Sequence, residues 1–96
     1  MGKQPYVYIL ASRRNGTLYV GVTSDLIKRV FQHRDNLAAG FTKRYGIHDL
    51  VWYEMHHSMD SAISREKQIK SWDRCSKIGL IEKGNSAWLD LWQELL

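Results

Sequence analysis

The sequence predicts an α+β fold in which helices pack on a small three-stranded antiparallel sheet, in the order β-β-α-β-α-α. Two observations predict the sheet. Residues 5–11 and 17–23 alternate tyrosine with aliphatic residues around the turn-like stretch RRNG, and residues 47–57 are rich in Val, Trp and Tyr. A third observation predicts the helices, because apolar residues recur at helical spacing in residues 25–35 and 59–74.

The first two strands are expected to form a hairpin. Asn15-Gly16 fits the positive φ angles of a type I′ turn, and with these residues at the turn Tyr8 would oppose Thr23. Side chains alternate between the two faces of a strand. One face therefore receives Tyr6, Tyr8, Tyr19, Gly21 and Thr23, and the other receives Val7, Ile9, Val20 and Val22. A four-residue loop gives the same partition, whereas a three-residue loop would divide the tyrosines.

Residues 25–35, DLIKRVFQHRD, predict the first helix. Thr23 or Ser24 can cap its start, and Asp25 favours the first turn. The expected buried stripe consists of Leu26, Ile27, Val30 and Phe31.

Arg29 and His33 are four residues apart and lie together at the edge of this stripe. Arginine offers a fork that matches phosphate oxygens, and histidine transfers protons near neutral pH. The structural alternative is a snorkelling arginine and a boundary histidine with satisfied hydrogen bonds.

The remaining elements follow in order. A glycine-containing loop over 36–46 leads to the third strand, and Ser58 opens the second helix, roughly 59–74. A short third helix is expected within 77–85. The final segment, 86–96, is amphipathic, with Trp88, Leu91, Trp92 and Leu95 at helical spacing.

Glu66 is an unusual residue for its place in the second helix, because apolar residues surround it on the helical wheel: Met59, Ala62, Ile63 and Ile69. A lone carboxylate there is costly unless a cation or donors satisfy it. Lys70, four residues later, would supply an ordinary ion pair. A divalent ion such as Mg²⁺, which prefers oxygen ligands, is the other explanation. Asp73 lies near the same stripe, so Glu66 is not unique in this respect.

Other residues with polar or reactive side chains have structural explanations. Asn85 precedes a serine and the amphipathic segment, which is typical of an N-cap. The single cysteine, Cys75, excludes an internal disulfide, and the adjacent His56 and His57 point in opposite directions along a strand. A zinc site is therefore not expected. The four tryptophans are most simply core residues.

Composition bounds the class of protein. Hydrophobic residues make up 44% and charged residues 25% of the 96 residues, which fits a single globular domain over 1–96. No apolar run is long enough to span a bilayer, and the first residues lack the apolar stretch of a secretory leader. With one cysteine, the simplest expectation is a cytoplasmic protein without a membrane partner.

Lysine and arginine exceed the acidic residues by 14 to 10, which gives a net charge of +4. An excess of positive charge favours a nucleic-acid partner, although a solvated basic surface explains it equally well. The candidate nucleic-acid-binding residues are Arg13, Arg14, Lys28, Lys43, Arg44 and Lys70.

Several motifs together resemble the GIY-YIG nuclease superfamily, and in particular its small single-domain bacterial branch. They are YVY at 6–8, YVG at 19–21, DLIKRVFQH at 25–33, REKQIKSW at 65–72 and IEKGNSAWLDL at 81–91. One departure is Tyr6, which stands where the family name has glycine. The first triplet alone is a weak signal, but the ordered set is specific and covers roughly residues 5–92.

The resemblance implies a role for each matching residue. Tyr8 and Tyr19 match the tyrosines of the two triplets, Gly21 the final glycine, Arg29 and His33 the helix arginine and histidine, Glu66 the metal-binding glutamate, and Asn85 a frequent asparagine. By resemblance, Glu66 holds one Mg²⁺ or Mn²⁺ ion and Arg29 neutralises charge on the phosphate. Tyr8 or Tyr19 would help to deprotonate water, assisted by His33. A phenol is a poor base at neutral pH unless Arg29 and the ion lower its pKa.

The function implied is therefore cleavage of phosphodiester bonds in DNA, with RNA left open as a substrate. The alternative is a nucleic-acid-binding module with weak or lost catalysis that assists a partner. Since 96 residues leave no room for a separate targeting domain, specificity would come from loops, a homodimer or a partner protein.

Overall fold

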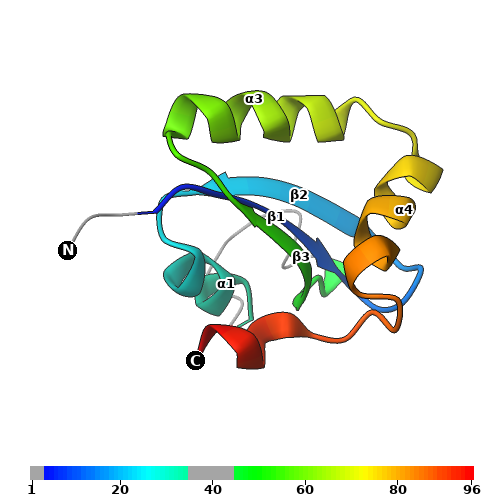
Figure 1. Cartoon of the computed structure of the whole chain (residues 1–96). Helices are drawn as coiled ribbons and strands as arrows, with labels where there is room; N and C mark the ends of the chain where they lie inside the picture. Colours follow the sequence, from blue (N-terminus) through cyan, green and yellow to red (C-terminus); the bar gives the residue numbers. More distant parts are fainter. Residues whose placement is uncertain (1–3, 35–44) are drawn as a thin grey trace.

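The computed structural model describes residues 4–34 and 45–96. Its three strands are β1 (Tyr6–Ala11), β2 (Leu18–Thr23) and β3 (Asp49–Met55), and they form an antiparallel sheet in the order β2-β1-β3. The helices are α1 (Leu26–Arg34), α3 (Met59–Lys70) and α4 (Arg74–Gly84), followed by a 3₁₀ helix, η1 (Leu91–Leu95). The predicted fold class and element order are confirmed (Figure 1).

The sheet carries a hydrophobic cluster on each face. Figure 1 shows α3 on one side of the sheet and α1 with the C-terminal segment on the other. The face toward α3 and α4 buries Val7, Ile9, Ala11, Val20 and Val51 against Ala62, Ile69, Ile81 and Trp88. The opposite face buries Tyr8, Leu10 and Leu50 against Leu26, Val30 and Ile47, with Tyr6, Tyr19, Tyr53, Leu91 and Trp92 packed around them. The predicted partition of tyrosines and aliphatic residues is confirmed.

The predicted register of the hairpin is wrong by two residues, because Tyr8 was expected to oppose Thr23. Tyr8 pairs with Gly21 and Tyr6 with Thr23, so the loop has four residues, 13–16. Within this loop only Asn15 has a positive φ, of 58°, whereas a type I′ turn needs two such residues. The Gly16 amide donates to the Arg13 carbonyl at 2.9 Å. The partition between faces survives because a four-residue loop keeps the same parity.

The start and the buried stripe of α1 also differ from expectation. Asp25 caps the helix by accepting from the Lys28 amide at 3.2 Å, while Thr23 Oγ1 accepts from the Asp25 amide. Ile27 and Phe31 are 48% and 46% exposed, so they do not belong to the buried stripe. Leu26 and Val30 are buried as predicted, and His33 is buried with them. The helix is therefore rotated so that the face carrying His33 meets the sheet.

The helical region after β3 is divided earlier than predicted. Ser58 caps α3 as expected, but the helix ends at Lys70. Asp73 then caps α4 by accepting from the Ser76 amide at 2.7 Å, so α4 begins at Arg74. An aspartate at this position restarts the helix in a new direction.

The C-terminal segment is held against the sheet by Asp90. Its carboxylate accepts from the Leu50 amide of β3 and forms an ion pair with Arg34 of α1. The Arg34 guanidinium also lies 5.3 Å from the centre of the Trp92 ring. These contacts hold the end of α1 against β3. Within the described residues, no helix is both long and apolar enough to cross a membrane.

Candidate active site

Tyr8 and Tyr19 lie beside each other on the face of the sheet that α1 covers. Their ring centres are 6.3 Å apart, and Tyr8 is 1% exposed. Gly21, which pairs with Tyr8 across the strands, leaves the space that the Tyr8 ring fills. A Cβ atom at residue 21 would lie 2.5 Å from both Cζ and Oη of Tyr8. The space left by the missing side chain of Gly21 is therefore taken by the Tyr8 phenol.

His33 of α1 lies against both tyrosines. Its Nε2 is 3.4 Å from the Tyr8 hydroxyl, and its ring centre is 5.4 Å from that of Tyr19. The side chain is buried, and burial, together with the charges of Arg29 and His48, lowers the pKa of His33 from 6.5 to about 4. The imidazole is therefore neutral at physiological pH and can accept a proton.

Arg29, one helical turn before His33, brings positive charge to the same phenols. Burial lowers the pKa of the guanidinium, but hydrogen bonding and charge interactions with Tyr8 and Tyr19 raise it above its ordinary value. Gln32 accepts a hydrogen bond from Arg29 Nη1 at 3.2 Å and helps to orient it. The Arg29 side chain also lines a cavity of about 230 Å³ at the start of α1, together with Lys28. The guanidinium thus stands between the buried phenols and solvent.

The pKa of Tyr8 differs from the expectation that cationic neighbours would lower it. Burial raises the pKa of Tyr8 to about 12, and the charges of Tyr19 and Glu66 add to this, while Arg29 opposes it. Arg29 therefore acts in the expected direction, but burial outweighs it in the protein without an ion. The charge of the Glu66 carboxylate also acts on Tyr8.

Glu66 lies on α3, the helix that covers the other face of the sheet. Its side chain is 14% exposed and forms an ion pair with Lys70 at 2.9 Å. The ordinary helical pair expected from the sequence is therefore present. A charge interaction with Tyr8 links Glu66 to the tyrosines, and its role as a metal ligand stays a prediction.

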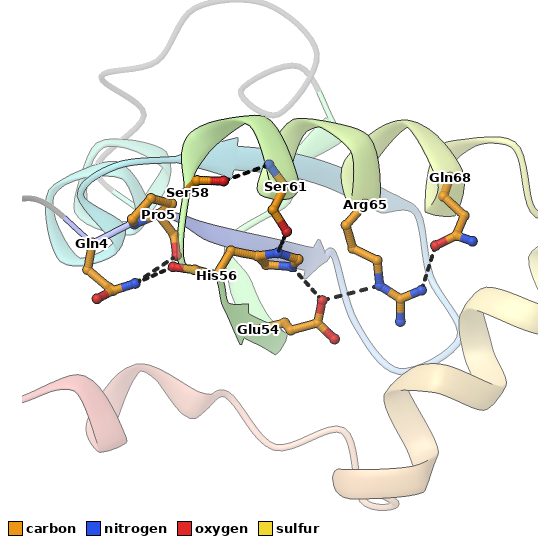
Figure 2. Close-up of polar contacts among 8 residues, drawn as sticks. All are labelled: Gln4, Pro5, Glu54, His56, Ser58, Ser61, Arg65 and Gln68. Atoms are coloured by element: carbon orange, nitrogen blue, oxygen red, sulfur yellow. Dashed lines mark hydrogen bonds and ion pairs between the residues drawn. The ribbon is translucent and has the colours of Figure 1, made fainter.

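A polar network fastens α3 to the end of β3 (Figure 2). Arg65 Nε donates to Glu54 at 3.2 Å, His56 Nε2 donates to the same carboxylate at 2.7 Å, and Ser61 donates to His56 Nδ1 at 2.6 Å. Gln4 joins from the strand leading into β1 by donating to the His56 carbonyl at 2.6 Å. Because Arg65 precedes Glu66 on α3, this network fixes the rotation of the helix and so the direction in which Glu66 points.

The residues present fit one hydrated hard cation. Across residues 4–34 and 45–96, no three His, Cys, Asp or Glu side chains gather to form a metal site made entirely by the protein. Mg²⁺ needs no such site, because it commonly uses one or two carboxylates, several waters and substrate phosphates. The carboxylate of Glu66 is suited to this kind of binding, whereas a zinc site has too few ligands.

Comparison with known proteins identifies the family of this chain. Residues 4–78 match the family model of the GIY-YIG catalytic domain. The chain belongs to the GIY-YIG family. Members of the family are nucleases that act on DNA and generally depend on a divalent metal, which indicates a nuclease-type enzyme.

The similar proteins are UPF0213 proteins of about the same length. A UPF0213 protein of Staphylococcus saprophyticus is 35% identical over 79 residues, which is 82% of this chain and 95% of that protein. One from Haloquadratum walsbyi is 36% identical over 84 residues, 88% of this chain and 93% of that protein. The solution NMR structure of a UPF0213 protein from Bacillus halodurans superposes with a TM-score of 0.57 at 28% identity, covering 91% and 92% of the two chains.

Asn85 does not lie with the tyrosines, Arg29 and His33. It lies after the matched range and ends α4, where its Nδ2 donates to the carbonyls of Val51 and Leu89 and its Oδ1 accepts from the Leu89 amide. The predicted N-cap is wrong, because these bonds close the helix end and tie it to the outer edge of β3. Strand β1 separates that edge from β2, so we give Asn85 a structural role.

The predicted nucleic-acid-binding residues that the structure describes lie on separate elements. Arg13 and Arg14 are exposed in the hairpin loop, Lys28 is exposed at the start of α1, and Lys70 pairs with Glu66. Lys43 and Arg44 lie outside the described residues.

Sequence reasoning missed two residues that contact Arg29 and His33, namely Gln32 and His48. Gln32 could have been found, since it follows Arg29 by three residues on the same helical face. His48 donates from Nδ1 to the His33 carbonyl at 2.9 Å and contributes to the low pKa of His33. No local pattern points to it, because the contact joins residues 15 positions apart.

His33 is expected to make the stability of the protein fall as the pH drops from 6.5 toward about 4. In this pH range His33 is protonated in the unfolded chain but not in the folded chain. The free energy of unfolding therefore falls by up to about 3 kcal/mol. A His33→Gln variant should lose this dependence, because glutamine does not titrate. Urea unfolding of both proteins near neutral pH and at about pH 4.5 measures the difference. An unchanged pH dependence in the variant would contradict the assignment.

Proposed function

We propose that this protein is a metal-dependent endonuclease that hydrolyses phosphodiester bonds in DNA. The observation that supports the proposal is the meeting of two phenols, a guanidinium and a neutral imidazole on the face of the sheet that α1 covers, with the charge of Glu66 acting on Tyr8. Phosphoryl transfer requires charge stabilisation and an oriented nucleophile, and these groups are suited to both tasks.

Arg29 binds the phosphate. Its fork matches two phosphate oxygens, and its hydrogen bonding to Tyr8 and Tyr19 orients it before substrate arrives. When an anionic phosphate neutralises Arg29, one of the charges that lower the pKa of His33 is balanced. Substrate binding therefore makes His33 a better proton acceptor.

Tyr8 and His33 move the proton of the attacking water. Tyr8 is neutral at physiological pH, so it cannot act as a simple base. Its hydroxyl can take a proton from water while passing its own proton to His33 Nε2, 3.4 Å away. Tyr19 lies at the same edge and orients the water. A single Mg²⁺ or Mn²⁺ ion held by Glu66 would supply Lewis-acid stabilisation of the phosphate and the leaving oxygen.

Cleavage assays test this proposal. Purified protein is incubated with supercoiled, branched and single-stranded DNA and with RNA, in Mg²⁺, Mn²⁺ or a chelator, beside a Glu66→Ala variant. Metal-dependent cleavage of DNA that the variant lacks supports the endonuclease. Binding without cleavage by either protein supports the alternative, a nucleic-acid-binding module that assists a partner. Equal cleavage by both proteins would identify a contaminant and remove support for Glu66 as the metal ligand.

A further inference from the structure

A second basic site lies at the loop of the hairpin, away from the tyrosines. A cavity of about 330 Å³ is lined there by Ser12, Arg13, Asn15, Gly16, Thr17 and Arg74. It forms where the β1–β2 loop meets the first residue of α4, two segments that lie side by side in Figure 1. Two guanidinium groups and the side chains of two hydroxyl residues therefore share one open depression.

Arg74 is held rigidly in this cavity. Its Nη2 donates to the carbonyls of Asn15 at 2.7 Å and Gly16 at 2.5 Å. Both bonds use the same nitrogen of a group that carries five N–H donors. The guanidinium is thus fixed in position while its other nitrogens keep donors for a ligand, which reduces the entropy lost on binding.

The side chain of Arg13 packs closely over the loop because Gly16 has no side chain there. A Cβ atom there would lie 2.9 Å from Arg13 Cγ and would collide with Ser12 Oγ. Asp73, the acidic neighbour of Arg74, is occupied as the cap of α4 and does not line the cavity. The cavity therefore offers concentrated positive charge to an anion.

We propose that Arg13 and Arg74 bind a backbone phosphate of the nucleic acid that flanks the phosphate to be cleaved. The inference rests on the proposed function in taking nucleic acid as the partner. Thr17 precedes Gly21 by four residues along β2, a separation of about 13 Å. Such contacts position the substrate without reading its sequence.

Binding measurements in a chelator test the site without requiring cleavage. Affinity for a short labelled DNA duplex is measured against salt concentration for the wild type and for Arg13→Ala, Arg74→Ala and Lys83→Ala. Each lost phosphate contact lowers the slope of log affinity against log salt by about 0.9. We expect this change for Arg13→Ala and Arg74→Ala. Lys83→Ala is the matched control, because it removes one exposed positive charge from the last turn of α4 but does not line the cavity.

Uncharged methylphosphonate groups, placed at one position at a time, locate the contact. The wild type should lose affinity when the methylphosphonate stands at one position flanking the cut. The Arg13→Ala variant keeps the Arg74 hydrogen bonds to the loop, and its affinity should not fall further when the same position is modified. Equal slopes for all three variants, or position-independent effects, would overturn the proposal. If the wild type binds but never cuts, the proposed function fails, while the position-specific result still decides this site.

Discussion

Replacing Glu66 with glutamine is expected to reduce metal-dependent DNA cleavage by about a thousandfold, because a bound cation contributes several kcal/mol to stabilising the transition state. Glutamine keeps the size of the side chain and removes the charge that attracts the ion. Cleavage rates measured across a range of Mg²⁺ and Mn²⁺ concentrations give both the maximal rate and the concentration for half-maximal activity. A variant that needs no more metal and cuts as fast as the wild type would show that Glu66 is not the ligand.

Lys70 provides the matched comparison. Its ammonium group lies 2.9 Å from Glu66 Oε2 and competes with a cation for that oxygen. The pair is largely exposed on the lysine side, so its strength is on the order of 0.2–1 kcal/mol. Lys70→Ala should therefore lower the metal concentration needed for half-maximal activity by about twofold to fivefold at most. A requirement for more metal in this variant would mean that Lys70 supports the ion instead of competing with it.

A second large effect is expected from Gly21→Ala, which should lower the cleavage rate by about a hundredfold because it displaces the Tyr8 hydroxyl by about 1 Å. The added Cβ atom would lie 2.5 Å from Tyr8 Cζ and Oη and 3.0 Å from Tyr19 Cε1. Tyr8 is buried and cannot move without disturbing its neighbours, so stability should also fall by about 1–3 kcal/mol. Unfolding in urea and cleavage rates measure the two effects.

Gly79→Ala is the control for this substitution. Gly79 lies within α4, and a Cβ atom there would meet nothing within 4 Å. This variant should keep full activity and gain up to about 1 kcal/mol of stability from helix propensity. Adding Tyr8→Phe to Gly21→Ala should restore part of the stability but none of the activity. Full activity of Gly21→Ala would refute the role of Gly21 in placing the Tyr8 hydroxyl.

The alternation of the hairpin and the helical spacing of Arg29 and His33 were sufficient to predict most of the candidate site. Alternation places Tyr8, Tyr19 and Gly21 on one face in every register in which the loop has an even number of residues. The register itself was not predictable, because it depends on whether the loop contains two residues or four. The structure has four, with Ser12 and Arg13 folded over Gly16.

The rotation of α1 could not be predicted from hydrophobicity. Ile27 and Phe31 are more apolar than His33, yet His33 is buried and they are half exposed. The imidazole is buried because it contacts the Tyr8 hydroxyl and the Tyr19 ring, and this environment exists only after the sheet has formed. Propensity and periodicity do not contain such long-range partners.

By itself, the sequence determined the α+β class, the three strands, the shared face of the tyrosines and the position of Glu66 within a helix, since these follow from local periodicity and residue spacing. Only the tertiary structure decided the protonation of Tyr8 and His33, the structural use of Asn85 and the meeting of Arg13 with Arg74. A pKa depends on burial and on charges from distant segments, and a contact such as that between Arg74 and the hairpin loop joins residues 58 positions apart. Local patterns carry no information about such distances, so packing alone sets them.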